Sequence, residues 1–139
     1  MLIHATCIAL NGAAVLLAGP AGAGKSDLAL RLIDTGAALV SDDQTFLMRD
    51  GENLIASPPD SIQGLIEVRH VGLLRMPFIK AARVALYIDL VAMSDDLERL
   101  PEKDEILLLD IPIRRLRLPA FTASTPAKIK AAMKYEMET

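Results

Sequence analysis

Residues 19–26 carry the strongest chemical signal in this chain. They read Gly-Pro-Ala-Gly-Ala-Gly-Lys-Ser, which fits the pattern G-x-x-x-x-G-K-S/T of a phosphate-binding loop (P-loop). Glycines let such a loop turn its backbone N–H groups toward one point, and the next helix aims its positive end there. The lysine of such loops reaches the β- and γ-phosphates, and the Ser or Thr hydroxyl binds Mg²⁺. The predicted phosphate-binding residues are Gly19, Pro20, Ala21, Gly22, Ala23, Gly24, Lys25 and Ser26.

The residues on either side of the loop fit this interpretation. The apolar run 13–18 predicts a buried strand, and residues 25–34 have helical periodicity, with Gly36 as the stop. The alternative is a glycine-rich turn between a strand and a helix, with an exposed lysine. The order of strand, loop and helix favours the phosphate site.

Asp42 and Asp43 are the first candidates for the carboxylates that phosphoryl transfer needs. They follow a short apolar strand expected over 37–41, and in α/β sheets the strand ends gather at the ligand-binding crevice. Neighbouring residues of an extended chain point in opposite directions, so the two acids need not share a role. The alternative is a solubilising or helix-capping turn. Asp89 and Asp110 also end apolar strands and compete for the metal-binding role.

Other polar residues leave two interpretations open. A lone histidine such as His4 in an apolar strand is usually structural. Glu67 and Arg69, in an otherwise apolar stretch, form either a local ion pair or part of a site. The basic run 114–117 forms either a solvated edge or a contact to phosphate or to an acidic partner.

The remaining pattern predicts an α/β fold in one domain, residues 1–139, with a P-loop-containing mixed sheet flanked by helices. Asn11-Gly12 is a strong hairpin signal. The expected strands cover 2–10, 13–18, 37–41, 45–49, 53–56, 83–93 and 106–109; an extended edge or loop covers 112–119, and helices cover 25–34 and 125–137. Residues 65–76 and 94–105 show no regular pattern.

Composition excludes several classes of protein. The net charge of −3 argues against a nucleic-acid or membrane-surface binder. No apolar run reaches the ~18 residues of a membrane span, and no signal peptide is evident, so a soluble cytoplasmic protein is expected. The single cysteine, Cys7, excludes an internal disulfide and is expected in the core.

Together these residues resemble the catalytic domain of the HPr(Ser) kinase/phosphorylase family. His4 stands 21 residues before Lys25, as in that family, and Asp27 follows the loop where the family has Glu. Residues 39–43, Leu-Val-Ser-Asp-Asp, are similar to its Leu-Val-Ala-Asp-Asp. Residues 66–74, Ile-Glu-Val-Arg-His-Val-Gly-Leu-Leu, are similar to its signature Met-Glu-Ile-Arg-Gly-Leu-Gly-Ile-Ile. The resemblance covers residues 2–93.

The resemblance implies an ATP- and Mg²⁺-dependent serine kinase that acts on the phosphocarrier protein HPr or a close relative. It implies a core like that of PEP carboxykinase and a homo-oligomer, hexameric in the family. By this resemblance, Asp43 is the base that takes the proton of the seryl hydroxyl, and Lys25 binds the phosphates. Ser26 and Glu67 bind Mg²⁺, and Asp42 supports the metal or the acceptor. His4 tunes Asp43, and Arg99 matches a family arginine.

The chain also departs from the family. It is expected to begin at the catalytic domain, without the usual N-terminal regulatory domain. Residues 111–119 stand in place of a Pro-Val-x-Pro-Gly-Arg-Asn loop, so the reverse phosphorolysis is not implied. His70 replaces a glycine of the signature. Two other functions stay open: a P-loop kinase for a small metabolite, and a non-catalytic nucleotide-binding module.

Overall fold

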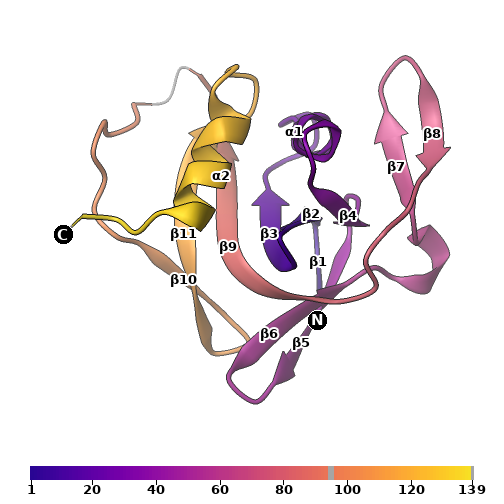
Figure 1. The fold of residues 1–139 in the computed structure, drawn as a ribbon, viewed down its shortest axis with the longest axis horizontal. Helices are drawn as coiled ribbons and strands as arrows, with labels where there is room; N and C mark the ends of the chain where they lie inside the picture. The colour runs from indigo at the N-terminus through magenta and orange to yellow at the C-terminus, as the bar shows by residue number, and fades with distance from the viewer. Residues whose placement is uncertain (94–95, 139) are drawn as a thin grey trace.

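A curled, mixed sheet of nine strands forms the body of the molecule, with two helices packed on it in the described part of the chain (Figure 1). The computed structural model describes residues 1–93 and 96–138. The strand order is β1-β5-β6-β9-β3-β2-β4, and β11 joins β9 to β10. The bounds are β1 Leu2–Ile3, β2 Ala5–Leu10, β3 Ala13–Ala18, α1 Lys25–Asp34, β4 Ala38–Ser41, β5 Thr45–Asp50, β6 Asn53–Ser57, β7 Leu65–Val68, β8 Gly72–Arg75, β9 Ala82–Val91, β10 Glu105–Leu108, β11 Ile111–Pro119 and α2 Thr125–Lys134.

The hairpin β2–β3 leads directly into the P-loop. Asn11 and Gly12 have φ angles of 50° and 83°, as a two-residue hairpin turn needs, and the strands pair in antiparallel register. On its other edge β3 pairs with β9 in parallel. The predicted strand over 13–18 and helix over 25–34 are confirmed. The predicted strand over 2–10 is broken by a bend at His4, which separates β1 from β2.

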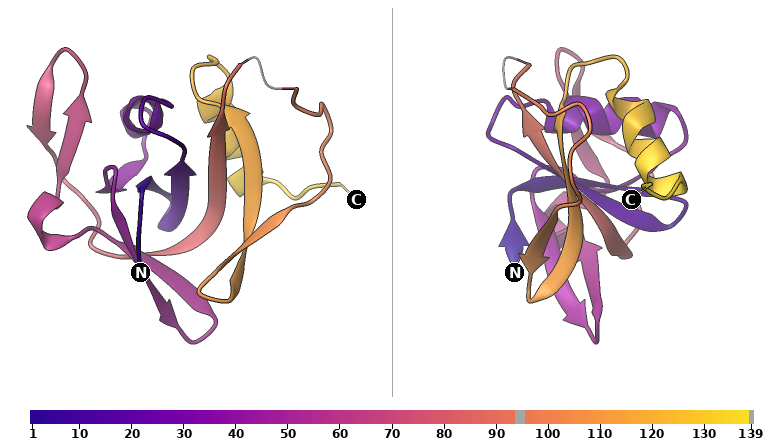
Figure 2. Two further views of the ribbon diagram at one scale, coloured as in Figure 1. Left: turned by 180° about the vertical axis from the view of Figure 1, so that it is seen from behind. Right: turned by 90° about the vertical axis from the view of Figure 1, so that its left-hand side faces the viewer.

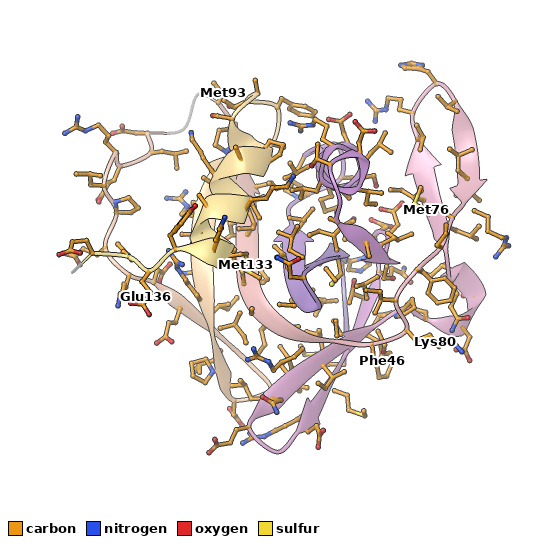
Figure 3. The ribbon with its side chains drawn as sticks, viewed as in Figure 1. Phe46, Met76, Lys80, Met93, Met133 and Glu136 are labelled. Atoms are coloured by element: carbon orange, nitrogen blue, oxygen red, sulfur yellow. The ribbon has the colours of Figure 1, made fainter. Side chains whose placement is uncertain are left out.

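Alternating side chains of β2 and β3 supply two cores, one on each face of the sheet. On one face, Ile8 and Leu17 pack with Leu28 and Leu32, which lie four residues apart on α1. Met76, the residue after β8, and Met133 of α2 pack against this core and are labelled in Figure 3. The residues of the other face include Cys7, Leu16, Val40, Leu47 and Leu54. Burial on both faces agrees with the high apolar content of the chain.

Two hairpins project from opposite ends of the molecule. The hairpin β7–β8 stands apart from the large sheet beside α1 (Figure 1), and the sequence pattern did not predict it. The predicted hairpin β5–β6 is confirmed, and it extends from the end far from α1 (Figure 2). The site described below lies at the α1 end.

The C-terminal third differs from the prediction. Strand β11 is an interior strand between β10 and β9, where an edge or loop was expected. Arg114 and Arg115 of this strand are partly buried and make contacts within the protein, whereas Arg117 is exposed. Arg115 pairs with Asp104 at 2.8 Å and with Asp89 at 3.9 Å, and Arg114 donates a hydrogen bond to the Ala132 carbonyl at 3.1 Å.

Helix α2 begins after Ser124 and ends at Lys134, three residues before the predicted end. The hydroxyl of Thr125, the first residue of the helix, donates to the Pro119 carbonyl at 2.5 Å. Both α-helices of the described chain have ten residues, a short 3-10 helix covers Asp60–Ile62, and none of these helices is long and apolar enough to cross a membrane.

Candidate active site

The P-loop connects β3 to the first turn of α1. Gly22 and Gly24 have φ angles of 82° and 97°, which L side chains rarely adopt, so the loop needs glycine at both positions. No side-chain hydrogen bond caps α1, whose cap residue is Gly24. The first-turn N–H groups of a helix that lacks a side-chain cap are suited to bind an anion.

The side chain of Lys25 folds back against the P-loop. Its Nζ donates a hydrogen bond to the Gly19 carbonyl at 2.9 Å and lies 3.6 Å from Oδ1 of Asp43. The side chain of Lys25 is 10 % exposed and that of Asp43 is 66 % exposed. The cation is therefore held against the loop, while the acid beside it faces solvent.

Asp42 is the buried hub of the site. Its Oδ1 accepts hydrogen bonds from the Ser26 hydroxyl at 2.6 Å and from the Thr6 hydroxyl at 3.0 Å. Its Oδ2 accepts one from the backbone N–H of Glu67 at 3.0 Å. A buried carboxylate needs such donors, and these three connect α1, β2 and β7 through one side chain.

Asp43 faces away from this hub. Its backbone has a φ of 65°, and its N–H donates to the Thr6 hydroxyl at 3.0 Å. Thr6 therefore contacts both acids, since it also donates to Asp42. The two neighbouring acids have different surroundings, as the sequence allowed: one is buried beside Ser26, and the other is exposed beside Lys25.

These groups open into one cleft of about 530 Å³, within the range of about 300–1,000 Å³ typical of small-molecule sites. The P-loop and α1 form its floor, and β7 forms one wall. Its lining residues are Ala21, Gly22, Gly24, Lys25, Ser26, Asp27, Leu30, Asp43, Glu67, Val68, Arg69 and Phe121. Glu67 and Arg69 both line this cleft, and no ion pair joins these two described residues.

The site offers oxygen donors of the kind that Mg²⁺ prefers. The Ser26 hydroxyl and the backbone N–H of Glu67 both donate to Asp42, so these three residues are neighbours, although in the described residues no three His, Cys, Asp or Glu side chains form a metal cluster on their own. Mg²⁺ commonly binds through one or two carboxylates together with substrate phosphates and water. The donor set fits a metal ion that binds together with a nucleotide.

Eight predicted residues do not line the cleft: Gly19, Pro20 and Ala23 of the P-loop and Asp42 beside Asp43 in the sequence, and His4, Asp89, Arg99 and Asp110, which lie elsewhere. His4 is exposed in the bend between β1 and β2, and Arg99 is exposed in the segment 96–104. Asp89 lies near Arg115, and Asp110 lies in the β10–β11 turn with a φ of 63°. His4 lies outside the cleft because it comes before β2, the strand that carries Thr6. Asp89 on β9 instead pairs with Arg115, and Asp110 forms part of a turn.

Two residues of the site escaped the sequence interpretation. Thr6 is fully buried within the apolar run 5–10. A buried hydroxyl needs a hydrogen-bond partner, so a threonine in an apolar run could have indicated a polar contact such as that with Asp42. Phe121 follows β11 and reaches the loop only through the fold, so no local pattern pointed to it.

The comparisons with known proteins agree on one family. The family model described as the HPr serine kinase C-terminal domain matches residues 1–139. The chain is 32% identical to the HPr kinase/phosphorylase of Geobacillus thermodenitrificans, over 98% of this chain and 48% of that protein. It is 37% identical to that of Bordetella pertussis, over 84% of this chain and 41% of that protein.

A solved structure shares the fold. The chain superposes on the Hpr(Ser) kinase/phosphatase from Coxiella burnetii with a TM-score of 0.85 and 29% identity, over 96% of this chain and 94% of that one. The mixed α/β architecture is therefore that of this neighbour. The chain spans less than half the length of the curated relatives it matches.

Proposed function

This chain belongs to the HPr serine kinase C-terminal domain family, and from that membership and the cleft we propose that it is an ATP-dependent protein-serine kinase. The acceptor would be a serine of the phosphocarrier protein HPr or a close relative. The printed names of the relatives and of the structural neighbour support this assignment.

The observation that carries the proposal is the position of Lys25 between the P-loop and Asp43, 3.6 Å from that acid. A seryl hydroxyl is a weak nucleophile at neutral pH, and a carboxylate near it can accept its proton as the bond to phosphorus forms. In the proposed reaction Asp43 takes this proton. Lys25 and the loop N–H groups stabilise negative charge on the transferred group.

Ser26, Asp42 and Glu67 would hold Mg²⁺ in the proposed site. When bound, the ion would supply positive charge that neutralises negative charge on the phosphates. Asp42 orients the Ser26 hydroxyl through their 2.6 Å hydrogen bond and ties the loop to β7 through the Glu67 N–H. The side chain of Asp42 thus links the first turn of α1 to β7, which supports their joint role in the proposed site.

His4 and Arg99 lie outside the cleft lining. His4 lies two residues before Thr6, whose hydroxyl contacts both Asp42 and Asp43. We therefore propose that His4 influences Asp43 indirectly, through the strand that carries Thr6. Arg99 is outside the cleft, and we assign it no contact with the reacting groups. The PEP-carboxykinase-like core, the homo-oligomer and the cytoplasmic location remain proposals that rest on the family resemblance.

The two rival functions make different predictions. A small-metabolite kinase would use Asp89 or Asp110 for its metal, but neither lines the cleft. A non-catalytic module would bind ATP without transferring phosphate. Radiolabelled γ-phosphate ATP, Mg²⁺ and purified HPr separate these cases, with mass spectrometry to locate phosphoserine. We expect a single phosphoserine on HPr, whereas ATP binding without phosphoserine would favour the module.

Adding inorganic phosphate to phosphorylated HPr in a second reaction tests the phosphorylase activity that the names of the relatives mention. The segment 111–119 forms interior strand β11 in this chain. We therefore propose that the kinase direction dominates. Rapid release of phosphate from phospho-HPr would contradict this part of the proposal.

A further inference from the structure

An aromatic ring lies directly on the P-loop. Phe121, between β11 and α2, lines the cleft together with Gly24 and Lys25. A Cβ atom built on Gly24 would lie only 2.7 Å from Cζ of Phe121, so the ring lies against the backbone of the loop. Yet 64 % of Phe121 is exposed. The ring therefore lies against the loop and still has a large surface that a ligand can reach.

The backbone on both sides of this ring is held in place. The Arg31 guanidinium donates hydrogen bonds to the carbonyls of Ala120 and Thr122, the latter at 3.4 Å. Its Nε donates to Asp27 on the same helix at 3.1 Å. Ala120 is 1 % exposed and is part of the core beside α1. These contacts fix the segment against α1 and leave only the Phe121 side chain to extend into the cleft.

The elements that carry Glu67 and Phe121 flank α1 on different sides. Figure 1 shows α1 between α2 and the β7–β8 hairpin, and α1 contacts both α2 and β7. Glu67 on β7 is on the hairpin side, joined to Asp42. Phe121 precedes α2, and Leu30 on α1 lines the same cleft. The cleft lining therefore includes residues of the P-loop, of β7 on the hairpin side and of the segment before α2.

We propose that Phe121 stacks against the base of the bound nucleoside triphosphate, with Leu30 as the neighbouring apolar surface. This inference rests on the proposed function, because it assigns the base of the same nucleotide to another part of the same cleft. The loop holds the phosphates, so the base extends away from Asp43 toward the one aromatic residue among the cleft-lining residues. A nucleobase and an aromatic ring stack face to face in an offset arrangement, and the contact removes apolar surface of both from water.

Tripolyphosphate provides the test, because it keeps the phosphates of ATP and lacks the base. Isothermal titration calorimetry in the presence of Mg²⁺ would measure Kd of both ligands for the full chain. For Phe121→Ala we expect about 5- to 100-fold weaker ATP binding, the range that base–aromatic stacking predicts. Tripolyphosphate affinity should stay within about twofold, and Phe121→Trp should keep ATP affinity.

Tyr135→Ala is the matched control. Tyr135 is an aromatic residue that is also 64 % exposed, at the far end of α2 and outside the cleft lining. Its loss should leave both affinities unchanged. An equal loss of ATP and tripolyphosphate affinity in Phe121→Ala, or no loss at all, would overturn the stacking role and leave the proposed function intact. A wild-type chain that binds neither ligand would overturn both.

Discussion

The Nζ of Lys25 lies 3.6 Å from Oδ1 of Asp43 while it donates a hydrogen bond to the Gly19 carbonyl at 2.9 Å. The lysine thus joins the backbone of the P-loop to the acid that we propose as the base. A phosphate oxygen that binds Lys25 is therefore also brought close to Asp43. We therefore expect substitution of Lys25 to change ATP binding and substitution of Asp43 to change the rate of phosphate transfer.

Lys25→Met should weaken ATP binding by about 10- to 100-fold, because a hydrogen bond to a charged group contributes about 1.5–3 kcal/mol. Methionine keeps much of the apolar stem, so the fold should be retained. Calorimetric Kd values for ATP check this. Lys80→Met is the control, since Lys80 is exposed and outside the cleft lining (Figure 3). Equal ATP affinity in wild type and Lys25→Met would contradict the phosphate role.

Asp43→Asn should slow transfer to HPr by about 10²- to 10⁴-fold, the usual contribution of a general base, and should leave ATP affinity similar or slightly higher. Affinity should not fall, because the substitution removes a negative charge beside the phosphates. Initial rates and Kd are measured on the same preparations. Asp110→Asn, in the β10–β11 turn, is the control. If transfer depended on Asp110 and not on Asp43, the small-metabolite kinase would be the better assignment.

Thr6→Val should destabilise the protein by about 1–3 kcal/mol, because the Asp43 N–H loses its acceptor and Asp42 loses a donor. Thr6→Ser keeps the hydroxyl and should restore most of the stability. Urea unfolding gives the free energies of unfolding. The valine variant should also transfer phosphate more slowly, since Thr6 positions both acids. A valine variant as stable and as active as the serine variant would show that this hydroxyl positions nothing.

Much of this architecture follows from local sequence. The apolar run 13–18, the glycine loop and the helical pattern of 25–34 each specify their own geometry, and Asn11-Gly12 specifies its turn. The β7–β8 hairpin could not be predicted in the same way. Its strands have four residues each and carry charged side chains, and its turn has His70 at a φ of 69°, a conformation uncommon for residues other than glycine.

The site itself was predictable in part. That Asp42 and Asp43 lie beside the loop follows from their position at the end of a strand. Which acid faces Ser26 does not follow, because it depends on the left-handed backbone of Asp43 and on the Thr6 hydroxyl from another strand. The interior position of β11, and with it the position of Phe121, depends on pairing with β9 across more than twenty residues of sequence.

Gly24→Ala should reduce both stability and ATP affinity. The φ of 97° strains any L side chain, at a cost of about 1–2 kcal/mol, and the added methyl would meet Phe121 at 2.7 Å and Ala120 at 2.9 Å. Gly12→Ala is the matched control, since Gly12 has a φ of 83° with no atom within 4 Å of the added methyl. It should reduce stability alone. Equal ATP affinity in the two variants would contradict a close approach at Gly24.

Cys7 predicts a pH dependence of stability with a definite sign. The thiol is fully buried, and burial raises its pKa far above the ordinary value of 9.0. Above pH 9 the unfolded chain therefore loses a proton that the folded chain keeps. Since stability falls wherever the unfolded state binds fewer protons, the wild type should lose about 1.4 kcal/mol per pH unit there.

Cys7→Ala lacks this ionisable group, so comparison with it isolates the contribution of Cys7 from that of Tyr87, whose pKa burial also raises. Below about pH 8, where the unfolded thiol is almost fully protonated, the difference in the free energy of unfolding between wild type and Cys7→Ala should be constant. Between pH 9 and 10.5 it should shift steadily against the wild type. Urea unfolding at half-unit pH steps measures it. Parallel profiles, or a native thiol that reacts with a disulfide reagent as fast as the denatured chain, would mean that Cys7 is accessible to solvent.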